Sequence, residues 1–300
     1  MDSAITRSAI LVFLILLGYG LKQAGLFKQS DSKVLSNIML YVTLPAVLVN
    51  AFRDFTPDPS LVLFAVLALA VNIVLLTVGW RVAARKSPMV RATYMICMAG
   101  FNIGSFAIPF LQNLFPQQMM EVILFDIGNS IMNCGIIYAF AAAQVHPEHR
   151  FRLRDLCRTL FSTFPFDLYI VLLALALLQV PIPAPIYQLA DTVEGANALV
   201  VMLMLGILFE VRLDREKRRQ VLGIVVTRYT TAAVLSALIV LFLPVPMEQR
   251  LVAVGLVCAP ISSMATVFCG KLGCDPDVYG TATSLTIPIS IAVMLGMSLV

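Results

Sequence analysis

Apolar stretches long enough to cross a lipid bilayer recur along the whole chain. A helix that rises 1.5 Å per residue needs about 20 apolar residues to span the hydrocarbon layer. Ten stretches of about this length are separated by charged or turn residues. They cover residues 5–21, 34–52, 60–80, 92–115, 118–144, 160–180, 186–209, 220–243, 251–270 and 278–300. We therefore expect an all-α polytopic membrane protein with ten transmembrane helices.

Composition excludes the main soluble classes. Hydrophobic residues make up 60% of the chain, charged residues 13%, and the mean hydropathy is +0.92, whereas soluble domains hold about 45–50% apolar and 25% charged residues. A soluble enzyme or a nucleic-acid partner is therefore not expected. The chain also has no Walker loop, no H-E-x-x-H and no G-x-S-x-G motif, so we expect no enzymatic activity, cofactor, metal site or ATP-driven pumping.

The distribution of Lys and Arg predicts the orientation. Alternate connections hold 17 of these residues against 3 in the others, and short cytoplasmic loops collect positive charge. The sequence thus predicts a multi-pass protein of the inner (plasma) membrane with both termini outside. Five spans then lie on each side of a basic cytoplasmic loop at residues 146–159, so residues 1–145 and 160–300 form two five-helix repeats of inverted topology. Inverted repeats are common in secondary transporters.

The fourth span carries polar residues beside a proline. Asn102, Ser105 and Pro109 are spaced i, i+3 and i+7, on one helix face, and Pro109 removes an amide donor while it clashes with a carbonyl one turn earlier. We expect a helix break there, which frees a half-helix N-terminus that can hold an anion. The alternative is an ordinary proline kink packed by small residues.

The ninth span supplies a matching interruption. Pro260 and Ser262 lie in the run Cys258-Ala259-Pro260-Ile261-Ser262. Two interrupted spans at corresponding places in two halves point to a substrate site. We therefore expect the interrupted fourth and ninth spans to form that site together.

The fifth span places a carboxylate in an apolar run. Asp126, Asn129 and Asn133 share one helix face, and an ionisable group at membrane depth usually faces a cavity or a partner. We expect Asn129 to contact the substrate, and Asp126 and Asn133 to support the site or take part in coupling. The alternative for Asp126 is that it reaches the outer membrane interface.

Three further charged residues have simpler interpretations. Arg228 lies inside the eighth span and is expected to snorkel toward the cytoplasmic side; the alternative is that it neutralises a carboxylate or attracts anions. Asp191 and Glu194, near the outer start of the seventh span, suit a helix N-terminus.

Several short motifs resemble bacterial members of the auxin efflux carrier family. They are Gly18-Tyr19-Gly20 through Gly25-Leu26, Leu35-Ser36-Asn37, Leu44-Pro45-Ala46, Phe101-Asn102-Ile103-Gly104 to Pro109, and Ala259-Pro260. The resemblance implies ten helices in two inverted repeats, as in bile-acid symporters. It implies a scaffold from helices 1, 2, 6 and 7, often making a homodimer. It implies a transport domain from helices 3–5 and 8–10, in which broken helices 4 and 9 cross beside the site. It also implies organic anions as substrates, including auxin and dicarboxylates such as malonate or malate.

The sequence therefore predicts a secondary carrier for a small carboxylate, coupled to protons or sodium and working by alternating access. One alternative is a sodium-coupled symporter of bile-acid type, with Asn129, Asn133 and Ser263 as candidate oxygen ligands. Another is a membrane sensor without a transport cycle.

Overall fold

The computed structural model describes residues 2–53, 55, 59–146, 148, 153–210 and 215–297. Within these ranges the regular structure is helical and no β-strand is present. The first half comprises α1 (Asp2–Gln23), α2 (Ser32–Ile38), η2 (Met39–Thr43), α3 (Leu44–Ala51), α4 (Pro59–Val82), α5 (Pro88–Met98), η3 (Ile103–Ala107), α6 (Ile108–Leu114), α7 (Met119–Ile131), η5 (Met132–Ile136) and α8 (Ile137–Val145). The second half comprises α9 (Leu153–Leu160), α10 (Phe164–Leu177), α11 (Ala184–Glu194), α12 (Ala196–Leu208), α13 (Arg215–Phe242), α14 (Met247–Val257), α15 (Ser263–Leu272) and α16 (Pro276–Met297). The prediction of an all-helical protein is confirmed.

Six described helical segments are long and apolar enough to cross a membrane. They cover Gln29–Ala51, Val62–Val82, Pro116–Val145, Ala184–Leu208, Lys217–Phe242 and Pro276–Met297. A seventh is possible if α9 and α10, which meet at an 82° bend, form one span. The predicted fourth and ninth spans appear as shorter pieces because a break separates α5 from η3 and α6, and another separates α14 from α15. The predicted first span appears as a shorter apolar helix, Ala9–Gln23. The count of ten thus stays a prediction.

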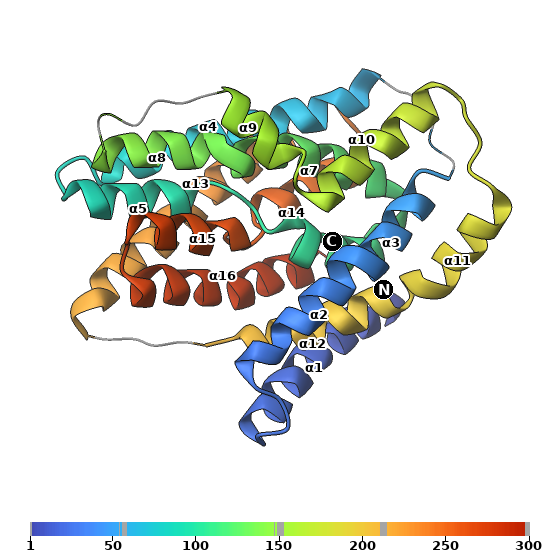
Figure 1. Ribbon diagram of the computed structural model, residues 1–300, viewed down its shortest axis with the longest axis horizontal. Helices are drawn as coiled ribbons and strands as arrows, with labels where there is room; N and C mark the ends of the chain where they lie inside the picture. Colours follow the sequence, from blue (N-terminus) through green and yellow to red (C-terminus); the bar gives the residue numbers. More distant parts are fainter. Residues whose placement is uncertain are drawn as a thin grey trace.

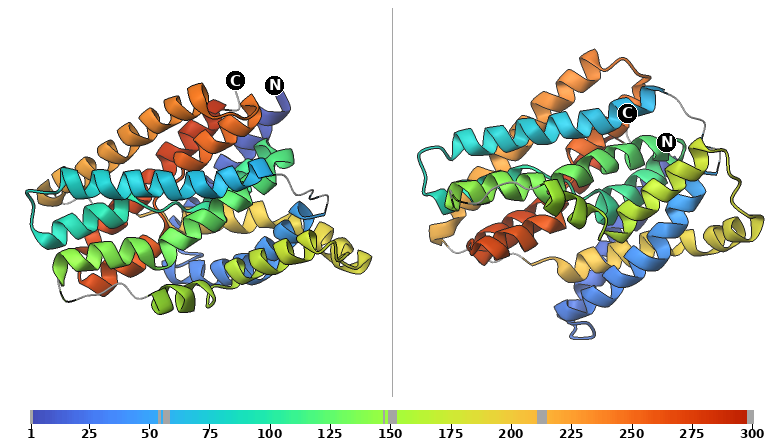
Figure 2. Two further views of the ribbon diagram at one scale, coloured as in Figure 1. Left: turned by 90° about the horizontal axis from the view of Figure 1, so that it is seen from above. Right: turned by 45° about the horizontal axis from the view of Figure 1, so that its top comes forward.

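The helices form two groups (Figure 1). We call α4 to α8 with α13 to α16 the bundle, and α1, α2, α3, α10, α11 and α12 the side group. Within the side group α1 packs along α12 and α11 along α3, whereas α4 packs on α5 and α7 in the bundle. The blue and yellow helices of the side group lie along one side of the bundle in two further views (Figure 2). The half-helix α6 contacts both groups.

The predicted basic loop at residues 146–159 is partly helical. Residues 147 and 149–152 lie outside the described residues, but α9 begins at Leu153 and places Leu156 and Leu160 against Cys134 and Phe166. The sequence did not predict this helix, because three of its eight residues are charged and its buried apolar side chains lie on one face only.

Candidate functional site

Two interrupted helices cross at the centre of the structure. The first interruption separates α5 from η3, and the second separates α14 from α15. Phe101 and Ile261 form an antiparallel β-bridge, and the amide of Asn102 donates to the carbonyl of Pro260 at 3.0 Å. The two interruptions predicted in the fourth and ninth spans therefore lie against each other.

The first break lies earlier than Pro109, so the expected position was wrong. Pro109 is buried in the first turn of α6, where a missing N–H is tolerated. The chain instead leaves the helix around Gly100, whose φ of +81° lies in the region that favours glycine. Pro260, in contrast, lies within the second break.

Three buried amides hold the first break in place. Asn129 clamps one residue from both sides: its Oδ1 accepts from the amide of Phe101 at 3.1 Å and its Nδ2 donates to the carbonyl at 3.0 Å. Asn72, on α4, accepts from the amide of Gly100 at 2.7 Å. Asn133 also donates to the Phe101 carbonyl, at 3.4 Å. Asn129 and Asn133 thus support the backbone of the break, and both polar side-chain atoms of Asn129 are already hydrogen-bonded.

Asp126 lies behind this clamp. It is 8% exposed, and its carboxylate accepts from Asn129 Nδ2 at 3.0 Å and from the hydroxyl of Tyr169 at 2.8 Å. The interpretation that Asp126 reaches the outer interface is therefore wrong. Because Tyr169 belongs to α10, this carboxylate also connects the bundle to the side group.

Hydroxyl groups hold the second break. Thr286 on α16 accepts from the amide of Ile261 at 3.2 Å, and Ser290 donates to the carbonyl of Cys258 at 2.7 Å. The hydroxyl of Tyr229, on α13, donates to the Thr286 carbonyl at 2.8 Å and lies 2.8 Å from that of Ser290. The two interruptions are thus supported in the same way, by one helix before and one helix after each break.

Arg228 joins the two breaks, and the expectation that it snorkels was wrong. Its side chain is 1% exposed and stacks on the Phe101 ring, 4.9 Å from the centroid. The guanidinium donates to carbonyls at the C-terminal ends of both preceding half-helices. These acceptors are Cys97 at 3.3 Å, Met98, Gly100 at 3.0 Å, Ala259 at 3.1 Å and Pro260 at 3.4 Å. Among the described residues no carboxylate lies within 4 Å of this cation.

The remaining predicted site residues differ in whether their side chains already have hydrogen-bond partners. Ser262 caps α15, because its Oγ accepts from the amide of Met264 at 3.2 Å. Asn102 and Ser105 are half-buried at the start of η3, and neither side chain has a hydrogen-bond partner among the described residues. Asn102 is therefore the predicted site residue best placed to meet a ligand. Ser263, a candidate sodium ligand, is exposed.

Sequence reasoning missed Asn72, Tyr169 and Thr286 as site residues. Asn72 had a usable signal, since it is the one polar amide in the apolar run at residues 61–76 and such residues usually find a partner. Tyr169 and Thr286 gave no signal beyond their residue type. Within the part of the chain that the structure describes, no group of three or more His, Cys, Asp or Glu side chains is arranged to hold a metal ion.

The clamp predicts a large effect of Asn129→Ala on stability. The buried amide and carbonyl of Phe101 would lose partners, and each unsatisfied group costs about 1–3 kcal/mol. We expect a clear fall in the thermal unfolding midpoint of the purified protein. Asn113→Ala is the matched control, because this amide donates only to the Pro109 carbonyl one turn earlier. Equal midpoints for the two variants would contradict the clamp.

Comparison with known proteins gives one match. The model of a family described as membrane transport protein matches residues 3–149, which include the first break and the amides that hold it. A search of curated proteins finds no match.

Proposed function

We propose that this chain, which belongs to the membrane transport protein family of the auxin efflux carrier type, is a secondary active transporter of a small organic anion that works by alternating access. The match confirms the family predicted from the sequence motifs. The observation that carries the anion specificity is Arg228, a buried cation without a carboxylate partner among the described residues, placed where the two broken helices cross.

The crossing has a positive electrostatic character. Arg228 satisfies the C-terminal carbonyls of α5 and α14, the ends that carry negative partial charge. The N-terminal ends of η3 and α15 remain, where the first amides of a helix lack intrahelical partners and attract anions. Asn102 adds an unpaired carboxamide at the start of η3. A carboxylate bound here would replace part of its hydration by these donors.

The support of the two breaks favours an inverted repeat. Asn72 precedes the first break by 28 residues, and Arg228 precedes the second by 31. Asn129 follows the first by 28 residues, and Thr286 follows the second by 25. These equivalent positions support two five-helix repeats, residues 1–145 and 160–300, with ten spans in total.

In this proposal the side group is the scaffold and the bundle is the transport domain. The charge distribution favours an orientation with both termini outside the inner membrane, and a homodimer would form through the scaffold. Among substrates we favour a dicarboxylate such as malonate or malate over auxin-like acids. Coupling to protons would involve Asp126, the buried carboxylate behind the clamp.

Uptake of labelled malonate into liposomes that contain the purified protein tests this function. We expect saturable uptake, reduced at least about tenfold by Asn102→Ala, since a hydrogen bond to a charged group contributes about 1.5–3 kcal/mol. Pro260→Ala should also reduce uptake. The exposed Asn37 of the side group provides the control variant Asn37→Ala. Unchanged uptake by Asn102→Ala would contradict the proposed site.

A further inference from the structure

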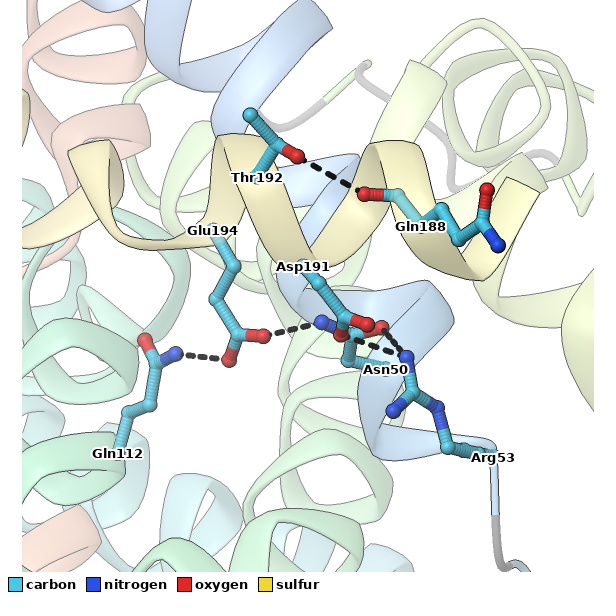
Figure 3. Close-up of polar contacts among 7 residues, drawn as sticks. All are labelled: Asn50, Arg53, Gln112, Gln188, Asp191, Thr192 and Glu194. Atoms are coloured by element: carbon cyan, nitrogen blue, oxygen red, sulfur yellow. Dashed lines mark hydrogen bonds and ion pairs between the residues drawn. The ribbon is translucent and has the colours of Figure 1, made fainter. Parts of the chain in front are cut away.

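A single carboxylate bridges the side group and the bundle (Figure 3). Glu194 is the last residue of α11. One of its oxygens accepts from the amide of Asn50 on α3, and the other accepts from the amide of Gln112 on α6. Since Asn50 belongs to the side group and Gln112 to the bundle, the contact to Gln112 crosses between them. Glu194 also lies two residues before α12 begins at Ala196, in keeping with an acid near a helix N-terminus, but its carboxylate is bonded to these two amides.

Further contacts within the side group hold Asn50 and Glu194 in place. Arg53 pairs with Asp191, one turn before Glu194, at 2.6 Å and donates to Asn50 Oδ1 at 3.0 Å (Figure 3). The Arg53 guanidinium also stacks on Tyr187, 4.7 Å from the ring centroid. Both Asn50 and Glu194 are thus held on the side group, so a movement of the bundle would break the Gln112 contact first.

The same interface is hollow at its other end. A cavity of about 200 Å³ lies between Gln29 and Glu210 of the side-group part of the chain and Asp277 and Ser284 of α16. Near the Glu194 end, by contrast, the side chain of Arg7 on α1 donates to the carbonyl of Asn113 on α6 at 3.4 Å. The interface between the bundle and the side group is therefore held by hydrogen bonds near Glu194 and contains a cavity at its opposite end.

We infer that Glu194 is a positioning residue that latches the bundle to the side group and keeps the extracellular end closed until the bundle moves. This inference rests on the proposed function, which supplies the moving bundle. The two bonds to Glu194 are charge-assisted when the carboxylate is ionised, and such bonds are roughly twice as strong as neutral ones. Loss of the charge or of Gln112 weakens the latch and raises the population of the open form.

A cysteine reporter measures this opening without a substrate. Leu44 on α3 is buried and faces Gly104 of η3 across the interface, so Leu44→Cys is protected while the interface is closed. Cys157 is the exposed cysteine of the described residues, and Cys157→Ser removes its background. The labelling rate is measured with a membrane-impermeant maleimide added outside intact expressing cells.

We expect Glu194→Gln and Gln112→Ala each to raise the labelling rate about tenfold, the factor that a weakened hydrogen bond to a charged group gives in an opening equilibrium. Gln188→Ala is the matched control, because this exposed side chain lies on the same helix outside the Arg53–Asp191 pair, and it should stay near the parent rate. Glu194→Gln combined with Gln112→Glu exchanges acceptor and donor and should restore protection. Rates equal to the parent's in both single variants, or no restoration in the exchange variant, would overturn the latch.

The result also separates the latch from the proposed function. If labelling rises as expected but malonate is not taken up, the latch stands and the substrate assignment fails. If malonate uptake is normal but labelling does not change, the latch alone is wrong.

Discussion

Arg228→Met is expected to abolish anion uptake and to lower the unfolding midpoint by about 10 °C. Five backbone carbonyls at the crossing would lose a donor, which costs several kcal/mol, and each kcal/mol corresponds to about 2–4 °C for a chain of this size. The positive charge that offsets a bound carboxylate would be lost as well. Uptake of labelled malonate and thermal unfolding of the purified protein measure the two effects.

Two further variants test whether the effect of Arg228→Met comes from its lost charge or from its lost hydrogen bonds. Arg228→Lys keeps the cation but offers three donors, so we expect reduced but measurable uptake. Arg218→Met removes an exposed cation from the same helix and should leave both uptake and midpoint unchanged. An Arg228→Met protein that folds and transports malonate at the normal rate would contradict the assigned role.

Gly100→Ala is expected to prevent assembly of the crossing. The φ of +81° is unfavourable for alanine, at about 1–3 kcal/mol. The added Cβ would also collide with Oδ1 of Asn133, which displaces an amide that supports Phe101. We expect loss of uptake and either a large fall in the unfolding midpoint or failure to obtain folded protein.

A second glycine with positive φ distinguishes the effect of backbone strain from that of the collision with Asn133. Gly273 has a φ of +76° but no atom near the position of an added Cβ, so Gly273→Ala should show only the backbone strain of about 1–3 kcal/mol. Gly100→Ala combined with Asn133→Ser makes room for the methyl group and should recover part of the stability. Equal effects of Gly100→Ala and Gly273→Ala would show that the collision is unimportant.

Much of the crossing could be predicted from local sequence. Small polar residues indicated an interruption in both the fourth and the ninth span, and Pro260 lies within the second break, although the first break lies earlier than Pro109. The common helix face of Asp126, Asn129 and Asn133 points to the first break. The roles were harder to predict than the positions. In the sequence Asn129 looks like a substrate ligand. In the structure its side-chain amide is hydrogen-bonded to the backbone of the first break, which exists only in the folded protein.

The contacts of Arg228 and Glu194 could not be predicted, for one physical reason. Arg228 lies near the middle of the 28-residue α13, where a long side chain could extend along the helix or turn inward. Its inward path depends on carbonyls that the two breaks expose, and these come from distant segments. Glu194 depends in the same way on Asn50 and Gln112, 144 and 82 residues away. Contacts over such separations leave no periodic signal in the sequence.

The central claim is that the crossing binds carboxylates through Arg228, Asn102 and the half-helix N-termini. A thermal-shift titration with small carboxylates and their uncharged amide counterparts tests it most directly, because a ligand that binds the folded state raises the unfolding midpoint. We predict that at least one dicarboxylate, with malonate as the first to try, stabilises the protein and its diamide does not, and that Asn102→Ala removes the shift. Equal stabilisation by diamide and dicarboxylate, or a full shift in Asn102→Ala, would contradict the account.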